Sequence, residues 1–189
     1  MTQPSHIFDV LIVGGGLVGS SCAVAMSNLG LRVGILDKKQ LIPQNLQNAE
    51  LNSRIYTISP SNAEWLRSLG IWERLVPDRI SFIDQMEIWG DKDAKSKAKA
   101  SLEFTSYGTN LSHLAYVIEE QVLQSGLWSA FDHRGVDVLT GEPLALESAA
   151  KHALLHLADG RALQSRLVIA ADGGDSAIRS LAGIPSLVH

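Results

Sequence analysis

The sequence has one cysteine, Cys22, among 189 residues. An internal disulfide is therefore excluded, and this cysteine usage is typical of a reducing compartment. Long hydrophobic runs are also missing, because the longest apolar stretch, Val10 to Val18, is too short to cross a bilayer and is interrupted by glycines. No basic segment precedes this stretch, so we expect no signal peptide and a cytoplasmic location. The net charge of −4 lacks the positive excess that nucleic-acid binding requires, so we expect no nucleic-acid partner.

Clustered metal ligands and a local catalytic triad are missing as well. The six histidines are scattered, and no pair has metal-ligand spacing beside an acidic or cysteine cluster, so we expect no metal site. No Ser-His-Asp arrangement has local support, and no catalytic side chain can be named. What remains is an ordinary composition, with 46% hydrophobic and 19% charged residues, which can support a buried core.

The first forty residues predict a β-strand, a helix and a second strand. Ile7 to Val13 is apolar and β-branched, as in a buried strand. Leu17 to Leu29 has helical apolar spacing and ends at Gly30, where a left-handed cap is usual. Leu31 to Leu36 predicts the second strand, which Asp37 closes. A crossover of this length predicts a parallel βαβ unit.

The middle of the chain predicts an alternation of surface loops, strands and helices. Ser61 and Glu64 have the spacing of a capping box, so we expect a helix from Asn62 to Leu69 that ends at Gly70. The other predictions here are a polar loop over Gln40 to Asn52, a strand over Ile80 to Trp89, an exposed charged loop over Asp91 to Ala100, and a second long helix over Tyr116 to Phe131.

The last third predicts short strands and a closing helix. Val136 to Leu139, Leu144 to Ser148 and Ala153 to Ala158 are expected to form a small antiparallel meander, with a hairpin turn at Asp159-Gly160. Leu167 to Ala171 predicts a buried strand, and Ser176 to Ala182 a short helix. The predicted fold class is therefore a three-layer α/β domain with a parallel sheet and a small antiparallel β-meander.

A glycine pattern carries the clearest functional signal. Gly14, Gly16 and Gly19 spell G-x-G-x-x-G directly after the first strand and at the start of the first helix. The first glycine permits a tight turn, the second lets a pyrophosphate approach the backbone, and the third lets the helix pack close to the sheet. The free amides and the positive end of the helix then bind the phosphates. A glycine-rich turn without a ligand is the simpler alternative, but strand, helix and second strand are all in place.

Asp37 follows the pattern at the distance expected of a ribose-binding acid. Its carboxylate would accept hydrogen bonds from ribose hydroxyls and repel a 2′-phosphate, which disfavours NADP at this site. Lys38 and Lys39 weaken that argument. The motif alone leaves both FAD and NAD open.

Four stretches resemble the group A flavoprotein monooxygenases, relatives of para-hydroxybenzoate hydroxylase, and in particular the ubiquinone-biosynthesis hydroxylases. The stretches are DVLIVGGGLVG from Asp9, SRIYTISPSNAEWLRSLGIWERL from Ser53, SHLAYVIEEQVLQSGLW from Ser112, and AADGGDSAIR from Ala170. The segment MEIWGDKD from Met86 is similar to the ubiquinone branch. Together they cover the chain almost from end to end, and the resemblance implies an FAD-binding Rossmann-like domain.

The resemblance also assigns cofactor contacts. Arg54 matches the arginine that reaches the FAD phosphates, for which a guanidinium is suited; a surface salt bridge is its alternative role. Asp172 matches the motif aspartate near the ribityl and pyrophosphate groups, and capping of the following helix is its alternative. Many relatives have a basic residue near Gln121, which here is neutral. The expected FAD contacts are Gly14, Gly16, Leu17, Val18, Gly19, Asp37, Lys38, Arg54 and Asp172.

The activity that this resemblance implies is that of an FAD-dependent monooxygenase with NAD(P)H as electron donor. The substrate would be a polyprenylated phenol or benzoquinol in ubiquinone biosynthesis, which implies contact with a membrane surface or a biosynthetic complex. Family members continue with a substrate-binding sheet and a Gly-Asp motif that these 189 residues lack. We therefore expect residues 1–189 to be one truncated FAD-binding domain, inactive alone. The alternatives are a non-catalytic nucleotide-binding fragment and an NAD-dependent dehydrogenase.

Overall fold

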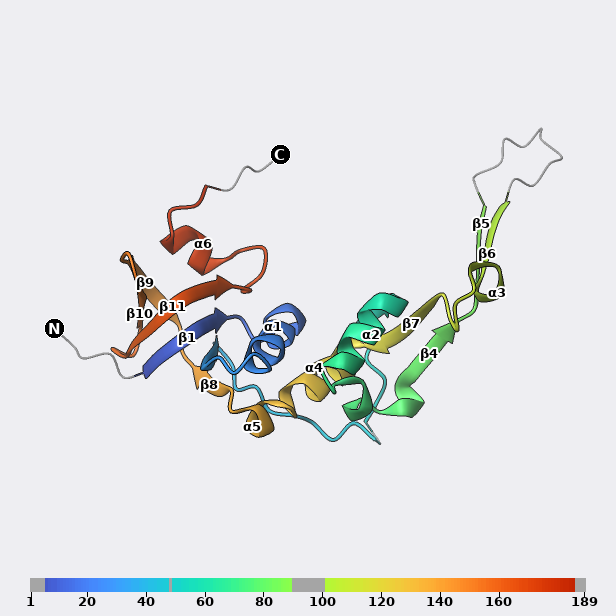
Figure 1. The fold of residues 1–189 in the computed structure, drawn as a ribbon, viewed down its shortest axis with the longest axis horizontal. Helices are drawn as coiled ribbons and strands as arrows, with labels where there is room; N and C mark the ends of the chain where they lie inside the picture. Colours follow the sequence, from blue (N-terminus) through green and yellow to red (C-terminus); the bar gives the residue numbers. More distant parts are fainter. Residues whose placement is uncertain (1–5, 48, 90–100, 186–189) are drawn as a thin grey trace. The chain divides into compact units, whose positions relative to one another are not determined.

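The computed structural model of the chain describes residues 6–47, 49–89 and 101–185 (Figure 1). The chain divides into two units. The first joins the two ends of the sequence, Met1–Asn45 and Leu123–His189, and the second is the inserted segment Leu46–Val122.

The first unit contains a six-stranded sheet in the order β8-β2-β1-β11-β10-β9. Strands β8, β2, β1 and β11 are parallel to one another, whereas β10 pairs antiparallel with both β11 and β9. This arrangement confirms the predicted α/β class, a parallel sheet with an antiparallel addition. Its elements are β1 (His6–Val13), α1 (Leu17–Ser27), β2 (Val33–Asp37), α5 (Phe131–Arg134), β8 (Asp137–Thr140), β9 (Pro143–Ser148), β10 (Ala153–Leu157), β11 (Ala162–Ala170) and α6 (Ala177–Leu181).

The core of this unit surrounds β1, the central strand of the parallel part. Phe8, Leu11 and Val13 on this strand are almost fully buried, as expected when both faces of a parallel sheet are covered. They pack with side chains from β2, β10, β11 and α6: Leu36, Leu155, Leu157, Leu163 and Ile178. Because β2 and β11 flank β1, the carboxyl ends of three parallel strands meet at one edge of the sheet. Ligands of open α/β sheets bind at such an edge.

The β-meander prediction was correct for β9 and β10, which pair antiparallel, but wrong for the strand near Val136. That strand, β8, pairs parallel with β2, with Ile35 opposite Val138. The last strand is also longer than predicted, because β11 forms a hairpin with β10 before it continues beside β1. The partner of β8 is distant in the sequence, and local patterns do not reveal it.

The second unit contains a three-stranded antiparallel sheet in the order β3-β7-β4 and a two-stranded sheet of β5 and β6. Helix α2 packs on β7, the central strand. The elements are β3 (Ile55–Ile58), α2 (Pro60–Ser68), the short 3-10 helices η1 (Trp72–Arg74) and η2 (Pro77–Arg79), β4 (Ile80–Ile83), β5 (Gln85–Trp89), β6 (Ser101–Thr105), α3 (Ser106–Thr109) and β7 (Ala115–Glu119). Helix α4 (Glu120–Trp128) begins in this unit, and its residues from Leu123 onward belong to the first unit.

Three predictions for the middle of the chain were wrong. Residues 115–119 form strand β7 instead of the first turn of a long helix, because β3 and β4 both bond to this β-branched and aromatic segment. The expected strand over Ile80 to Trp89 is two strands in different sheets, β4 and β5. The cap of α2 is Ser59, whose hydroxyl accepts from the Asn62 amide, because Pro60 takes the first helical position.

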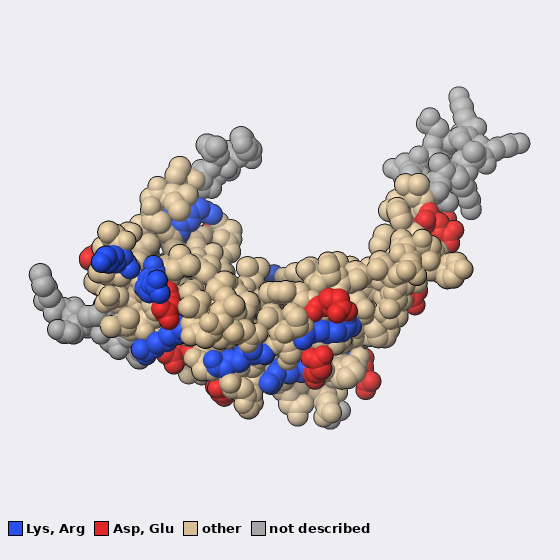
Figure 2. Space-filling view, in the orientation of Figure 1, with Lys and Arg blue, Asp and Glu red and all other residues tan. Residues whose placement is uncertain are grey.

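The charged loop predicted over Asp91 to Ala100 lies outside the described residues. On the face drawn in Figure 2, basic and acidic side chains are interspersed. Ion pairs such as Arg166–Asp9 and Arg161–Asp159 join the two kinds of side chain in the first unit. No helix in the described part of the chain is long and apolar enough to cross a membrane.

Candidate functional site

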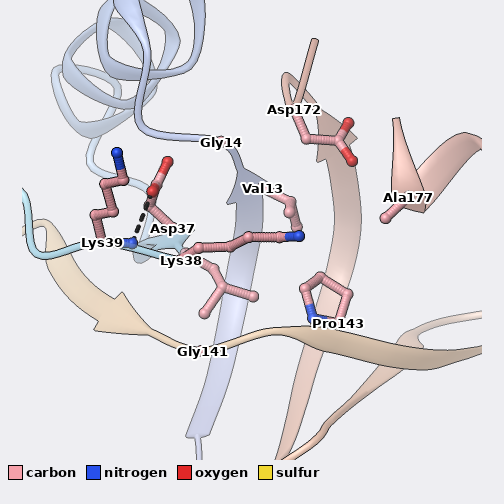
Figure 3. Close-up of a pocket in the computed structure, with 10 residues that line it drawn as sticks. Val13, Gly14, Asp37, Lys38, Lys39, Gly141, Pro143, Asp172 and Ala177 are labelled. Atoms are coloured by element: carbon pink, nitrogen blue, oxygen red, sulfur yellow. Dashed lines mark hydrogen bonds between the residues drawn. The ribbon is translucent and has the colours of Figure 1, made fainter. Parts of the chain in front are cut away.

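A pocket lies at the carboxyl ends of the parallel strands in the first unit (Figure 3). It includes four of the predicted cofactor residues, Gly14, Asp37, Lys38 and Asp172. The other lining residues come from the same strand ends, from the turn between β8 and β9, and from the start of α6: Val13, Leu36, Lys39, Gly141, Pro143 and Ala177. Residues more than a hundred positions apart in the sequence thus converge where the fold predicts a ligand.

The three glycines of the fingerprint have separate structural roles. Gly14 has a φ of +109°, and a Cβ there would overlap the Ala171 carbonyl group. A Cβ on Gly19 would overlap the carbonyl oxygen of Gly14, so α1 packs directly on the turn. In contrast, a Cβ on Gly16 would meet no heavy atom within 4 Å. The fold therefore needs Gly14 and Gly19, whereas Gly16 leaves open space beside the backbone.

The N-terminus of α1 suits an anion. Gly16 is the N-cap and offers no side chain to the amides of the first turn, which also contains no acidic residue. The first amides of a helix have no intrahelical acceptor, and the helix dipole adds partial positive charge there. Leu17 and Val18 follow in this turn and do not line the pocket; Val18 is 76% exposed. A phosphate group fits this open, donor-rich end of the helix.

Asp37 is fixed by backbone amides at the end of β2. The Gly15 amide donates to its Oδ2 at 2.7 Å, and the Lys39 amide donates to its Oδ1 at 2.9 Å. A carboxylate has about four lone-pair positions, so these two bonds leave acceptor capacity on both oxygens. The geometry fits a ribose whose two hydroxyls both donate. It also ties the position of Asp37 to the glycine-rich turn.

Lys38 crosses the pocket, and Lys39 points toward the glycine-rich turn (Figure 3). The Nζ of Lys38 lies 3.0 Å from Glu142 Oε1, in an ion pair whose two side chains are both more than 60% exposed. Such exposed pairs contribute little to stability and are readily exchanged for another anion. Lys38 is therefore a mobile positive charge within reach of the pocket.

Asp172 closes the opposite side of the pocket, at the end of β11. Its Oδ1 accepts from the Ser176 hydroxyl at 2.5 Å, and its Oδ2 accepts from the Ile178 amide at 3.1 Å. Partial burial opposes ionisation, but these hydrogen bonds outweigh it and hold the pKa of Asp172 below its ordinary value. The N-cap of α6 is Ser176, so Asp172 supports the helix from outside it, and its carboxylate stays ionised beside the pocket.

Arg54 lies in the second unit, before β3. Its Nε forms a 3.0 Å ion pair with Glu120 Oε2, and its side chain is 67% exposed. The salt bridge considered as its alternative role is thus present in the structure, and the FAD contact of Arg54 stays a prediction. Its backbone is held on both sides, because the amide donates to Asn52 Oδ1 and the carbonyl accepts from the Glu120 amide.

A buried ion pair that the sequence did not indicate holds the segment before Arg54. Arg79 donates from Nε and from one terminal nitrogen to the two carboxylate oxygens of Glu119, both at 2.6 Å, and each side chain is only 7% exposed. Arg79 also donates to the carbonyls of Leu46, Ala49 and Glu50. The hydrogen bonds from Arg79 hold the pKa of Glu119 below its ordinary value.

Sequence reasoning also missed the support behind the glycine-rich turn. Ser20 and Trp128 both bond to the carbonyl oxygen of Gly15. No pattern could have indicated this contact, because Trp128 lies in a helix far along the chain. The turn at Gly141 and Pro143 carried a usable signal, since Gly and Pro two residues apart are typical of turns.

Comparisons with known proteins agree with this site. A family model described as FAD binding domain matches residues 8–188. The chain is 30% identical to the 3-demethoxyubiquinol 3-hydroxylase of Escherichia coli over 178 residues, which cover 93% of the chain and 44% of that protein. It is 29% identical to the mitochondrial ubiquinone biosynthesis monooxygenase COQ6 of Danio rerio, with coverage of 98% and 40%. The chain therefore spans less than half the length of these curated relatives.

Solved structures show the same fold. The P. aeruginosa protein PqsL in complex with 2-aminobenzoylacetate superposes with a TM-score of 0.75 at 19% identity, over 97% of this chain and 48% of PqsL. The p-nitrophenol 4-monooxygenase PnpA of Pseudomonas putida superposes with a TM-score of 0.72 at 15% identity, over 94% and 44%. At these identities the likeness extends to the fold alone.

Proposed function

Because this chain belongs to the FAD binding domain family, we propose that its pocket binds FAD as part of a monooxygenase. The observation that carries the proposal is the open backbone at Gly16, which is the uncapped start of α1 and follows the Gly15 amide that bonds to the carboxylate of Asp37. A ribose at Asp37 and a pyrophosphate at the helix N-terminus are neighbouring groups of one dinucleotide. The family match runs through both units, and we propose that residues 1–189 act as one FAD-binding domain.

The residues that we assign to the cofactor divide the work of binding. Asp37 accepts from the ribose hydroxyls, and the amides of Gly16 and the following residues donate to the pyrophosphate. Lys38 adds positive charge, and Arg54 adds a guanidinium suited to phosphate oxygens. Asp172 remains ionised, and we propose that it accepts hydrogen bonds from the cofactor on the far side of the pocket.

The proposed reaction is the hydroxylation of a polyprenylated phenol or benzoquinol ring in ubiquinone biosynthesis. Two of the relatives carry names from this pathway, a 3-demethoxyubiquinol 3-hydroxylase and a ubiquinone biosynthesis monooxygenase. When bound, FAD would accept electrons from NAD(P)H and activate molecular oxygen, which is the source of the inserted oxygen atom, while the protein would bind and orient the cofactor and exclude water. For that reason we assign no catalytic side chain to this chain.

The β5–β6 hairpin has an exposed apolar face that suits contact with a membrane, in which a lipophilic substrate would be dissolved. Met86 lies opposite Phe104, and Ile88 lies opposite Leu102, so all four side chains share one face. Each of them is at least 41% exposed. We propose that the protein works at a membrane surface, where a prenylated ring is available. Co-sedimentation with phospholipid vesicles tests this location, and a protein that stays in the supernatant at low salt contradicts it.

A second function, cofactor binding without turnover, is favoured by one observation. Catalysis needs a substrate pocket in addition to a cofactor pocket, and the site described here accounts for the cofactor alone. The two functions differ in whether bound FAD is reduced and reoxidised.

The decisive experiment is the visible absorption spectrum of the purified chain, before and after FAD is added and the sample desalted. Retained flavin bands support the proposed site, and a colourless protein overturns it. NADH and oxygen consumption by the flavin-loaded protein then separates the functions. Consumption that rises with a prenylated phenol indicates the monooxygenase, whereas retained flavin without consumption indicates a binding domain.

A further inference from the structure

Two hydrogen-bond donors fix the carbonyl oxygen of Gly15. The Ser20 hydroxyl donates to it at 2.9 Å, and the indole Nε1 of Trp128 donates to it at 3.1 Å. The same indole nitrogen lies 3.1 Å from Ser20 Oγ, so its proton is shared between the two acceptors. Ser20 is fully buried, and Trp128 is half-buried at the end of α4, within the first unit.

This anchor sets the direction of the next amide. The carbonyl of Gly15 and the N–H of Gly16 belong to one planar trans peptide group, so they point in opposite directions. Because the carbonyl oxygen is bonded to Ser20 and Trp128, the Gly16 N–H points away from these side chains. The backbone at Gly16 is also open to an approaching group, since an added Cβ meets no heavy atom within 4 Å.

The turn needs an anchor of this kind because it consists of three consecutive glycines. Glycine has no Cβ and adopts both signs of φ with little penalty, so the peptide group between Gly15 and Gly16 can rotate easily. If the group rotated by half a turn, its carbonyl oxygen would face an incoming phosphate and repel it. The bonds from Ser20 and Trp128 stabilise the orientation that presents a donor.

We propose that Trp128 is a positioning residue for cofactor binding: its indole N–H, together with Ser20, holds the Gly15–Gly16 peptide so that the Gly16 amide faces the FAD pyrophosphate. This inference rests on the proposed FAD site. Trp128 acts through the backbone of the turn and does not line the pocket. Its contribution is therefore specific to ligands that carry phosphate.

The test is a comparison of Trp128→Phe with the wild-type chain. Phenylalanine keeps an aromatic ring but lacks the N–H donor. We expect FAD and ADP to bind about three- to tenfold more weakly, the range of one lost hydrogen bond, while adenosine, which has the ribose but no phosphate, binds with unchanged affinity. Trp65→Phe, at a 43% exposed position, is the matched control. Ser20→Ala removes the other donor and should act in the same direction, and the double variant should show less than the product of the single effects.

Isothermal titration gives the three affinities, and urea unfolding of the cofactor-free variants gives their stability. Equal affinity of Trp128→Phe and wild type for FAD overturns the inference and leaves the FAD site intact. A uniform loss of FAD, ADP and adenosine affinity in both the Trp128 and Ser20 variants also overturns it, because it indicates a structural role alone. A wild-type chain that binds no FAD overturns the proposed function, and this inference with it.

Discussion

Gly16→Ala should abolish cofactor binding and leave stability nearly unchanged, whereas Gly19→Ala should lower the stability of the fold. Each change adds one methyl group to the same turn. Gly16 has a φ of −68° and a ψ of −175°, which alanine adopts without strain, and its Cβ would meet no atom within 4 Å. Loss of a good N-cap residue costs about 1 kcal/mol. The reduced freedom of the unfolded chain offsets about 0.4–1 kcal/mol of this. The stability of Gly16→Ala should therefore stay within about 1 kcal/mol of the wild type.

Cofactor binding by Gly16→Ala should nevertheless be lost. The methyl group would occupy the space through which a pyrophosphate approaches the amides of the turn. Each hydrogen bond to a charged group contributes about 1.5–3 kcal/mol. The loss of two such bonds weakens binding by at least about a hundredfold, at 1.4 kcal/mol per factor of ten. Gly16→Val should give a stronger version of the same result.

Gly19→Ala should lose stability instead. Its methyl group would overlap the carbonyl oxygen of Gly14, an atom of the backbone that no side-chain rotation can move away. Overpacking of this kind costs about 1–3 kcal/mol, and more where the backbone must shift. Helix α1 would have to move off β1, so we expect a loss of about 3 kcal/mol in the free energy of unfolding.

Flavin fluorescence titration and urea unfolding of the cofactor-free protein measure the two quantities separately. The reasoning fails if Gly16→Ala binds FAD like the wild type, because the pyrophosphate then lies elsewhere. It also fails if Gly19→Ala unfolds at the wild-type urea concentration, because the close approach of α1 to the turn is then not required.

Three further results are expected. Glu119→Gln should lower the free energy of unfolding at pH 7 by about 3 kcal/mol, because it leaves a buried guanidinium without its counter-charge. The pKa of Glu119 is lower in the folded state than its unfolded value of 4.5, so the stability that the carboxylate contributes is present above pH 4.5 and is lost as the pH falls further. Thermal unfolding at pH 3 should therefore show a smaller difference between variant and wild type than at pH 7. Asp37→Ala should lower the affinity for FAD and for adenosine alike, by about tenfold or more, because it removes the acceptor of the ribose hydroxyls. A loss of FAD affinity with unchanged adenosine affinity would contradict this assignment. Arg54→Ala should weaken FAD binding by about one to two orders of magnitude, because a charge-assisted contact is lost. Glu120→Gln, which frees Arg54 from its ion pair, should not weaken it. Equal dissociation constants for Arg54→Ala and wild type would leave Arg54 a surface residue.

The sequence predicted the parts of the fold that depend on neighbouring residues. The βαβ unit from His6 to Asp37 could be read from its glycines and its apolar periodicity, because the pairing of β1 with β2 and the packing of α1 on both strands form within one supersecondary unit. The same holds for the hairpin at Asp159-Gly160. The glycine-rich turn and Asp37 were found in this way, and the structure brings both to one pocket.

The failures share a physical cause, which is pairing between distant segments. Residues 115–119 were read as helix because their apolar spacing suits one, and their strand form depends on hydrogen bonds to β3 and β4. Strand β8 was placed in the meander because it is short, and its partner β2 lies a hundred residues earlier. Trp128 and Arg79 could not be found at all, since their roles depend on which carbonyl groups the fold brings to them.

The pairing of β1 has a consequence for how the protein is made. One edge of this strand bonds to β2, with Val10 opposite Val33, but its other edge bonds to β11, with His6 opposite Leu163. Contacts of such large sequence separation slow folding. At translation rates of about 5–20 residues per second, the free edge of β1 waits on the order of ten seconds for its partner to be synthesised. An unpaired apolar strand edge is prone to aggregation during that interval. Strand β1 thus leaves the ribosome before both of its partners and is enclosed only after the later one has followed.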